Sequence, residues 1–137
     1  MADYEQEGMY SITVDKEKNR MHLLFFGQWS VPEDVPKYTD HVAKATSLMK
    51  KGFHILAEIR DKKPPSLKVT GIHKKGQQIM KKAGVNKTAV IIAKGRKGQF
   101  LQKMTLNVVG RLSGMTIKTF TSVEEGEAWL DEKKENE

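Results

Sequence analysis

Two short, unbroken apolar runs constrain the fold of this chain more than any other feature. The first is Leu23, Leu24, Phe25 and Phe26, and the second spans residues 88–93. Continuous apolar runs of this length, the second rich in β-branched residues, are typical of strands that are covered on both faces. The sequence therefore predicts a sheet with these two strands near its centre.

The segments around these runs alternate between strand and helix patterns. Residues 10–15, 53–60 and 116–120 are the other predicted strands. Helical periodicity predicts helices over 35–49, 66–83 and 97–112, with Asp34 as N-cap of the first. Ser122 and Glu125 have capping-box spacing for a last helix that ends at Leu130. The order ββαβαβαβα predicts an α/β fold with a mixed sheet of about five strands and flanking helices.

The length of 137 residues suits one hydrophobic core, so we expect a single domain over residues 10–131. Residues 1–9 and 132–137 are polar and acidic and are predicted to be tails. The chain has no cysteine, its N-terminus has no signal-peptide pattern, and no apolar run approaches the roughly 18 residues of a membrane span. These features predict a cytoplasmic protein without membrane insertion.

Positive charge is concentrated in the middle of the chain. The net charge is +7, but residues 60–103 contain thirteen basic residues and one acid, Asp61, so this block carries +12. The second predicted helix presents lysines on its solvent side, and these form a candidate basic patch: Lys68, Lys74, Lys75, Lys81 and Lys82. Such a surface can attract acidic proteins, phosphorylated ligands or nucleic acid, or it can simply keep the domain soluble.

Motifs for catalysis and metal binding are missing from the sequence. The four histidines do not have ligand spacing on one helix, and no nucleophile elbow or phosphate-binding glycine loop occurs. Acids are scarce where a cleft at the carboxyl ends of the strands would need them. The sequence thus predicts no catalytic residue, no metal and no cofactor, and a binding protein rather than an enzyme.

One glycine-rich turn has the composition of an anion site. Gly95, Arg96, Lys97 and Gly98 join a buried strand to a predicted helix, where backbone N–H groups, the helix dipole and two cations would converge. The same residues also suit a tight turn that needs glycines and binds nothing.

The whole pattern resembles a known family. The element order, together with the ending FTSVEEGEAWL at residues 120–130, resembles the STAS-type proteins similar to the sporulation stage II anti-sigma-factor antagonist (SpoIIAA-like). The resemblance spans residues 10–130. It implies a small mixed sheet backed by helices and a non-catalytic regulatory or ligand-binding module.

The resemblance also implies a candidate phosphoswitch region. In the antagonists a strand ends in Asp-Ser-Ser-Gly, and a serine at the start of the next helix is phosphorylated. Asp61 matches the aspartate, but Lys62, Lys63 and two prolines follow it here. Ser66 is the nearby hydroxyl, and it is displaced along the loop.

Two functions are therefore expected. The first is binding of a protein partner, or of a small anionic or lipophilic ligand, near the third strand and second helix. The alternative is nucleic-acid binding through the basic block 60–103, which the lack of Trp and Tyr in that block disfavours. The oligomeric state stays open, a homodimer included.

Overall fold

The computed structural model of the chain describes residues 2–63, 66–95 and 116–132. In this part of the chain, one six-stranded mixed sheet has its strands in sequence order. The β1–β2 and β2–β3 pairs are antiparallel, whereas the pairs from β3 to β6 are parallel. The strands are β1 Tyr4–Gln6, β2 Tyr10–Asp15, β3 Arg20–Gly27, β4 His54–Lys62, β5 Lys87–Ile91 and β6 Thr116–Phe120.

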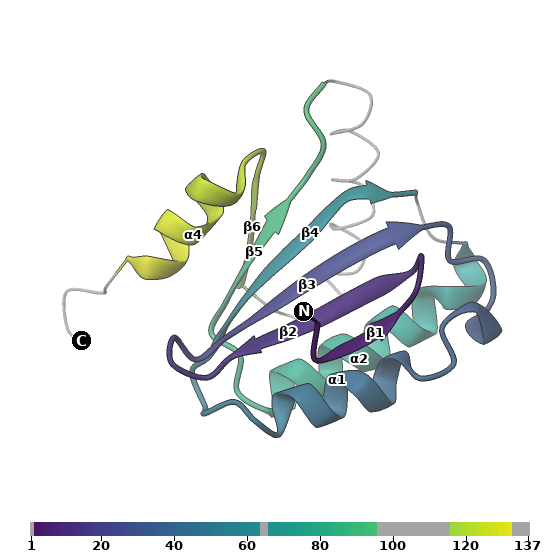
Figure 1. Cartoon of the computed structure of the whole chain (residues 1–137), viewed down its shortest axis with the longest axis horizontal. Helices are drawn as coiled ribbons and strands as arrows, with labels where there is room; N and C mark the ends of the chain where they lie inside the picture. The colour runs from purple at the N-terminus through teal and green to yellow at the C-terminus, as the bar shows by residue number, and fades with distance from the viewer. Residues whose placement is uncertain (1, 64–65, 96–115, 133–137) are drawn as a thin grey trace.

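Helices cover both faces of this sheet (Figure 1). Helices α1 (Tyr38–Thr46) and α2 (Thr70–Lys82) lie side by side on one face, and α4 (Val123–Asp131) lies on the other. Two short 3-10 turns, η1 (Pro32–Asp34) and η2 (Leu67–Val69), precede α1 and α2. The α/β architecture predicted from the sequence is confirmed, with six strands in place of about five.

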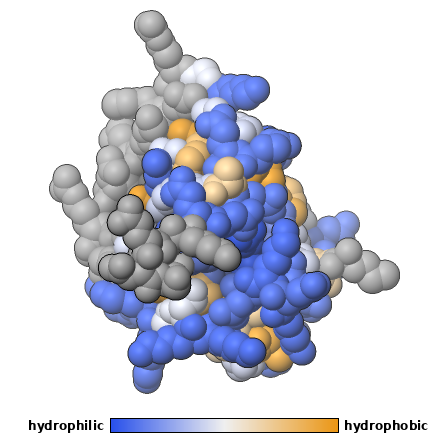
Figure 2. All heavy atoms as spheres, turned by 90° about the vertical axis from the view of Figure 1, so that its left-hand side faces the viewer, coloured by the Kyte–Doolittle hydropathy of each residue, from blue (hydrophilic) through white to orange (hydrophobic). Residues whose placement is uncertain are grey.

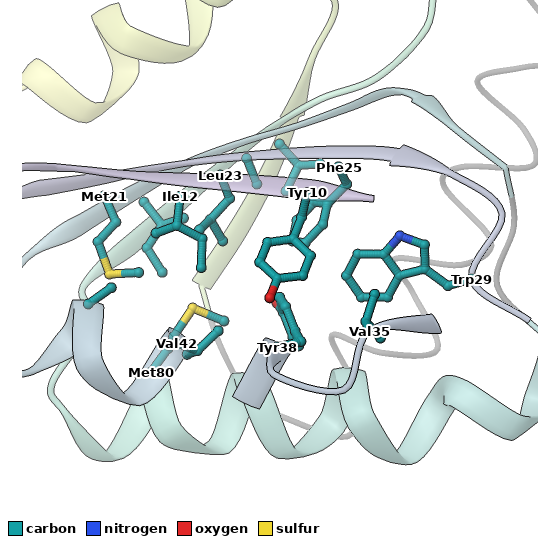
Figure 3. Packing of buried hydrophobic residues seen from close by; sticks show 14 of the residues in the cluster. Tyr10, Ile12, Met21, Leu23, Phe25, Trp29, Val35, Tyr38, Val42 and Met80 are labelled. Carbon is teal, nitrogen blue, oxygen red and sulfur yellow. The ribbon is translucent and has the colours of Figure 1, made fainter. Parts of the chain in front are cut away.

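The main hydrophobic core lies between the sheet and helices α1 and α2 (Figure 3). The largest fully buried side chains include Trp29, Tyr10, Tyr38 and Phe53. Tyr10 and Tyr38 meet edge to face with ring centroids 5.2 Å apart, and Trp29 contacts both. Aromatic pairs of this geometry add to the stabilisation from burial alone. This end of the core is therefore well ordered by ring packing.

A smaller cluster fills the opposite face of the sheet under α4. It consists of Leu56, Ala89, Ile91 and Leu130, with Phe120, Val123 and Trp129 packed against it. Because β5 contributes Val90 to the first cluster and its neighbours to the second, β5 is buried on both faces, as predicted. β3 differs from the prediction, since only Leu23 and Phe25 of its apolar run are buried, while Leu24 and Phe26 are half-buried.

The N-terminal segment was predicted to be a tail, and this prediction is wrong for residues 4–6. Tyr4–Gln6 form β1, which pairs with β2, and the backbone N–H of Asp3 donates to the carbonyl of Ile12 at 2.9 Å. The Tyr4 ring also lies 5.4 Å from the His41 ring of α1. A strand of three residues is too short to show a periodicity, and these long-range contacts hold it on the sheet.

Of the two predicted N-caps, the one at α1 is wrong and the one at α4 is confirmed. Asp34 does not cap α1, because its Oδ2 accepts hydrogen bonds from the backbone N–H groups of Ser30 and Val31, and α1 begins later. At α4 the predicted cap is present: the N–H of Glu125 donates to Ser122 Oγ at 3.2 Å. The predicted helix over 97–112 lies outside the described residues.

The surface around α4 is mainly hydrophilic, with small apolar spots between charged side chains (Figure 2). Among the described residues, no helix is both long enough and apolar enough to cross a bilayer.

Candidate functional site

The carboxyl ends of β3 and β4 meet the start of α2 at one end of the molecule (Figure 1). Two backbone hydrogen bonds hold the connecting loops together: Lys63 N–H donates to the carbonyl of Gly27 at 3.0 Å, and Ser66 N–H to that of Trp29 at 3.3 Å. Ligands of open α/β sheets bind outside the carboxyl ends of the strands. This edge of the sheet is therefore the candidate site.

A bulge in β4 decides which side chains face the helices there. Alternate residues from Ile55 to Ile59 face the core under α1 and α2, and continued alternation would place Asp61 there too. After Glu58, however, the pairing with β3 shifts. Between the pairs Leu24–Glu58 and Phe26–Asp61, β4 has one residue more than β3. Bulges commonly redirect a side chain in this way. As a result Lys62 points toward α2, and Asp61 is exposed.

Lys62 lies beside two aromatic rings, those of Trp29 and His73. Its Nζ lies 4.8 Å from the centre of the Trp29 ring and 3.1 Å from Nε2 of His73. The Trp29 and His73 rings are themselves stacked, with centroids 4.7 Å apart and planes 8° apart. A lysine side chain has only donors, so Nε2 of His73 accepts this hydrogen bond and the imidazole proton lies on Nδ1.

Burial lowers the pKa of both basic groups. The pKa of Lys62 falls to about 8, because its ammonium loses hydration. The pKa of His73 falls to about 3, first because of burial and then because of repulsion from Lys62. His73 is therefore neutral near pH 7. No ion pair joins Lys62 to a carboxylate in the part of the chain that the structure describes.

The structure places both residues of the predicted phosphoswitch region at this edge. Asp61 lies on β4 with an exposed side chain. Ser66 is the N-cap residue of η2, and its Oγ donates a hydrogen bond to the carbonyl of Ser30. The next residue, Leu67, is 93% exposed. The loop thus presents an apolar side chain beside a tethered hydroxyl.

The other sequence-predicted groups lie elsewhere. In the basic patch Lys74 is half-buried and the other four lysines are exposed along η2 and α2. Gly95 is exposed and has φ +100°, which suits a glycine turn. Arg96, Lys97 and Gly98 lie outside the described residues, so the candidate anion site stays a prediction. Within the described ranges, no three potential ligands cluster as a metal site would require.

Sequence reasoning missed the Lys62, Trp29 and His73 cluster. These residues come from β4, the loop after β3, and α2, and no motif links them. It also missed a polar pair on the other face, where His22 Nε2 lies 2.6 Å from Glu58 Oε2, and Arg60 donates to Glu58 Oε1. His22 lies on β3 and Glu58 on the neighbouring β4, so only the pairing of these two strands brings the side chains together.

The strand order, the parallel β3 to β6 and the two helical layers define a mixed α/β domain with helices on both faces of its sheet. Among solved structures, the chain is similar to an uncharacterized protein of the DUF3478 family from Shewanella loihica PV-4, described as having a SpoIIAA-like fold. The match has a TM-score of 0.65 and covers 93% of this chain and 98% of that one, at 17% identity. No family model matches the chain, and neither does any curated protein.

At this identity the likeness concerns the fold alone. The SpoIIAA-like fold that the resemblance implied is confirmed.

Proposed function

We propose that this protein is a non-catalytic, cytoplasmic STAS-like regulatory module that binds a protein partner through the loop between β4 and α2. The single observation that carries the proposal is the exposure of Leu67, which is 93% accessible at the start of η2. A large aliphatic side chain in water gains free energy when a partner covers it. The position also coincides with the switch region that the resemblance implies.

The charges around Leu67 indicate the chemistry of the partner. Lys63 and Lys68 are exposed on either side of it. Between Asp61 and Glu124 the chain has no acidic residue, so little negative charge from the sequence neighbourhood offsets them. An acidic surface with a small apolar depression is complementary to this arrangement. Small anionic or lipophilic ligands are the other occupants that this edge would suit.

Site-specific photocrosslinking tests the proposal. A photoreactive amino acid replaces Leu67 in one variant and Leu48 in a control. Leu48 is 41% exposed and precedes β4, whereas Leu67 follows it, so the two positions lie at opposite ends of that strand. In extracts of the native cells we expect a discrete adduct from position 67 and none from position 48. Equal patterns from both positions would contradict the proposal, and an adduct of twice the chain mass would identify a homodimer.

Variants then measure the contribution of each residue to binding of the captured partner. Leu67→Ser should weaken binding about tenfold or more, as loss of an apolar anchor does. Ser66→Asp tests the switch: a phosphate on Oγ would remove the hydrogen bond to Ser30 and add negative charge beside Lys63 and Lys68. If Ser66 is a regulatory site, Ser66→Asp changes affinity and Ser66→Ala does not. Identical affinities would leave Ser66 as an N-cap residue only.

Nucleic-acid binding is the second candidate function. It is favoured by the exposure of Lys68, Lys75, Lys81 and Lys82, none of which has an ion pair with another described residue. Binding of duplex DNA through about five phosphate contacts should fall with salt at a log–log slope near −4.5. A Lys75→Gln and Lys82→Gln double variant should reduce this slope by about 2. An unchanged slope would exclude these lysines from the interface.

A further inference from the structure

The amine of Lys62 lies in surroundings unlike those of an ordinary surface lysine. Its Nζ sits over the Trp29 ring at 4.8 Å and contacts Nε2 of His73 at 3.1 Å. Trp29 is fully buried and His73 is stacked on it, so the walls of this environment are rigid rings. Water is thus partly replaced by apolar surface around a group that ordinarily carries a charge.

No carboxylate among the described residues compensates the charge of this amine. None of the ion pairs among the described residues includes Lys62. The Trp29 ring and the acceptor nitrogen of His73 stabilise an ammonium in part, but neither carries a negative charge. An ammonium that loses hydration without gaining a counter-ion favours its neutral form. A neutral lysine amine has a free lone pair and is a nucleophile.

We propose that Lys62 is a reactive amine that forms a Schiff base with small aldehydes at the edge where β3 and β4 meet α2. Nζ attacks the carbonyl carbon, the carbonyl oxygen takes up a proton, and the resulting carbinolamine loses water. The products are an imine, in which Nζ is doubly bonded to the former carbonyl carbon, and one water molecule. No oxidant or reductant is needed.

The contact with His73 orients the amine for this reaction. A neutral amine can donate one N–H to Nε2 and still direct its lone pair away from the imidazole. His73 does not retain the proton that the ammonium loses, because its pKa is about 3, so this proton passes to solvent. His73 is a positioning residue, and Lys62 alone forms the covalent bond.

The expected gain in reactivity follows from the fraction of neutral amine. An ordinary lysine has a pKa of about 10.4. For Lys62 the pKa is lowered to about 8, so near pH 7.5 a neutral amine is on the order of 100-fold more abundant. A less basic amine is also a weaker nucleophile, which offsets part of this advantage. We expect a net rate for Lys62 about tenfold that of an exposed lysine.

The test is labelling of the full chain with a limiting amount of pyridoxal 5′-phosphate, followed by borohydride reduction. Peptide mass spectrometry then gives the rate at each lysine. Lys63 is the matched control, because it is adjacent in sequence and exposed. At pH 7.5 we expect labelling of Lys62 to be about tenfold faster than that of Lys63, and to level off above about pH 8. In denaturing urea the preference should vanish.

Variants complete the test. Lys62→Arg keeps a cation beside Trp29 but has no nucleophilic amine, and it should abolish the fast phase of imine formation, whereas Lys63→Arg should retain it. Circular dichroism checks that both variants are folded. Labelling of Lys62 at the rate of Lys63 or slower, a rate that climbs steadily to pH 10, or a preference that survives in urea would each overturn the proposal.

Discussion

The indole of Trp29 and the imidazole of His73 lie face to face, with planes only 8° apart, although they come from a loop and a helix far apart in the sequence. The stack forms one wall beside Lys62. Burial of the imidazole and, second, repulsion from Lys62 lower the pKa of His73 and keep it neutral. Stability, charge and reactivity at this edge of the sheet therefore depend on the same two rings.

Neutral His73 should give the protein a characteristic acid sensitivity. In the unfolded chain a histidine titrates near pH 6.5, whereas the pKa of His73 in the folded protein is about 3. Between these values the unfolded state binds the extra proton, so the stabilisation is complete above about pH 6.5 and is lost as the pH falls. His73→Phe, which keeps a ring against Trp29, should flatten this dependence by up to ~1.4 kcal/mol per pH unit.

Urea unfolding of both proteins between about pH 4 and pH 7 measures the effect. Carboxylates titrate in the same range, but they are common to both proteins and cancel in the difference. Parallel curves for parent and variant would show that His73 does not titrate differently in the folded state.

Two glycines of α2 should respond oppositely to the same substitution. A Cβ at Gly76 would lie 2.9 Å from Cε2 of the buried Tyr38, whereas a Cβ at Gly71 would meet nothing within 4 Å. We expect Gly76→Ala to destabilise the domain by about 1–3 kcal/mol through overpacking. Gly71→Ala should stabilise it by roughly 0.5–1 kcal/mol, because alanine favours a helix. Thermal melts of the two variants measure these changes in stability. An equal shift of the melting temperature in both variants would refute the close approach of α2 to Tyr38.

The central position of β5 predicts a large cost for truncation there. Ile91 is fully buried beneath α4, so Ile91→Ala should lower the free energy of unfolding by about 2–5 kcal/mol. Leu24 on β3 is only half-buried, and Leu24→Ala should cost less than half as much. Denaturant titration measures the free energy of unfolding of both variants. A larger loss for Leu24→Ala than for Ile91→Ala would contradict the central position of β5.

The end of α4 is attached to the sheet by a salt bridge from an otherwise buried guanidinium. Arg20 NH2 donates to Asp131 Oδ1 at 2.5 Å, and Nε and NH1 of Arg20 have no hydrogen-bond partner within the described ranges. Asp131→Ala leaves the Arg20 guanidinium without a hydrogen-bond partner among the described residues. The variant should lower the free energy of unfolding by about 1–3 kcal/mol. Asp40→Ala breaks an exposed pair with Lys44 and should cost at most about 0.5 kcal/mol.

The same salt bridge has a predictable pH dependence. The hydrogen bond from Arg20 lowers the pKa of Asp131, so its stabilising contribution is present above about pH 4 and declines as the pH falls below that value. Chemical denaturation of the parent and of Asp131→Ala at neutral and acidic pH checks this expectation. A difference between parent and Asp131→Ala that grows in acid would contradict it.

Local sequence patterns by themselves determined much of the architecture. The run at residues 88–93 predicted a strand buried on both faces, because each face of a central strand must be apolar, and β5 has this property. The spacing of Ser122 and Glu125 predicted the start of α4, because capping uses groups only three residues apart. Both signals depend on near neighbours, so no tertiary information was needed.

Tertiary structure alone decided the remaining features. β1 is a strand because β2 offers it a ladder of hydrogen bonds, and its three residues have no preference strong enough to reveal this. The bulge in β4 carries no sequence signal, yet by adding one residue against β3 it turns Lys62 toward Trp29 and His73 and turns Asp61 outward. A residue's chemistry here depends on strand register, and register is set by pairing between distant segments rather than by the residue's own neighbours.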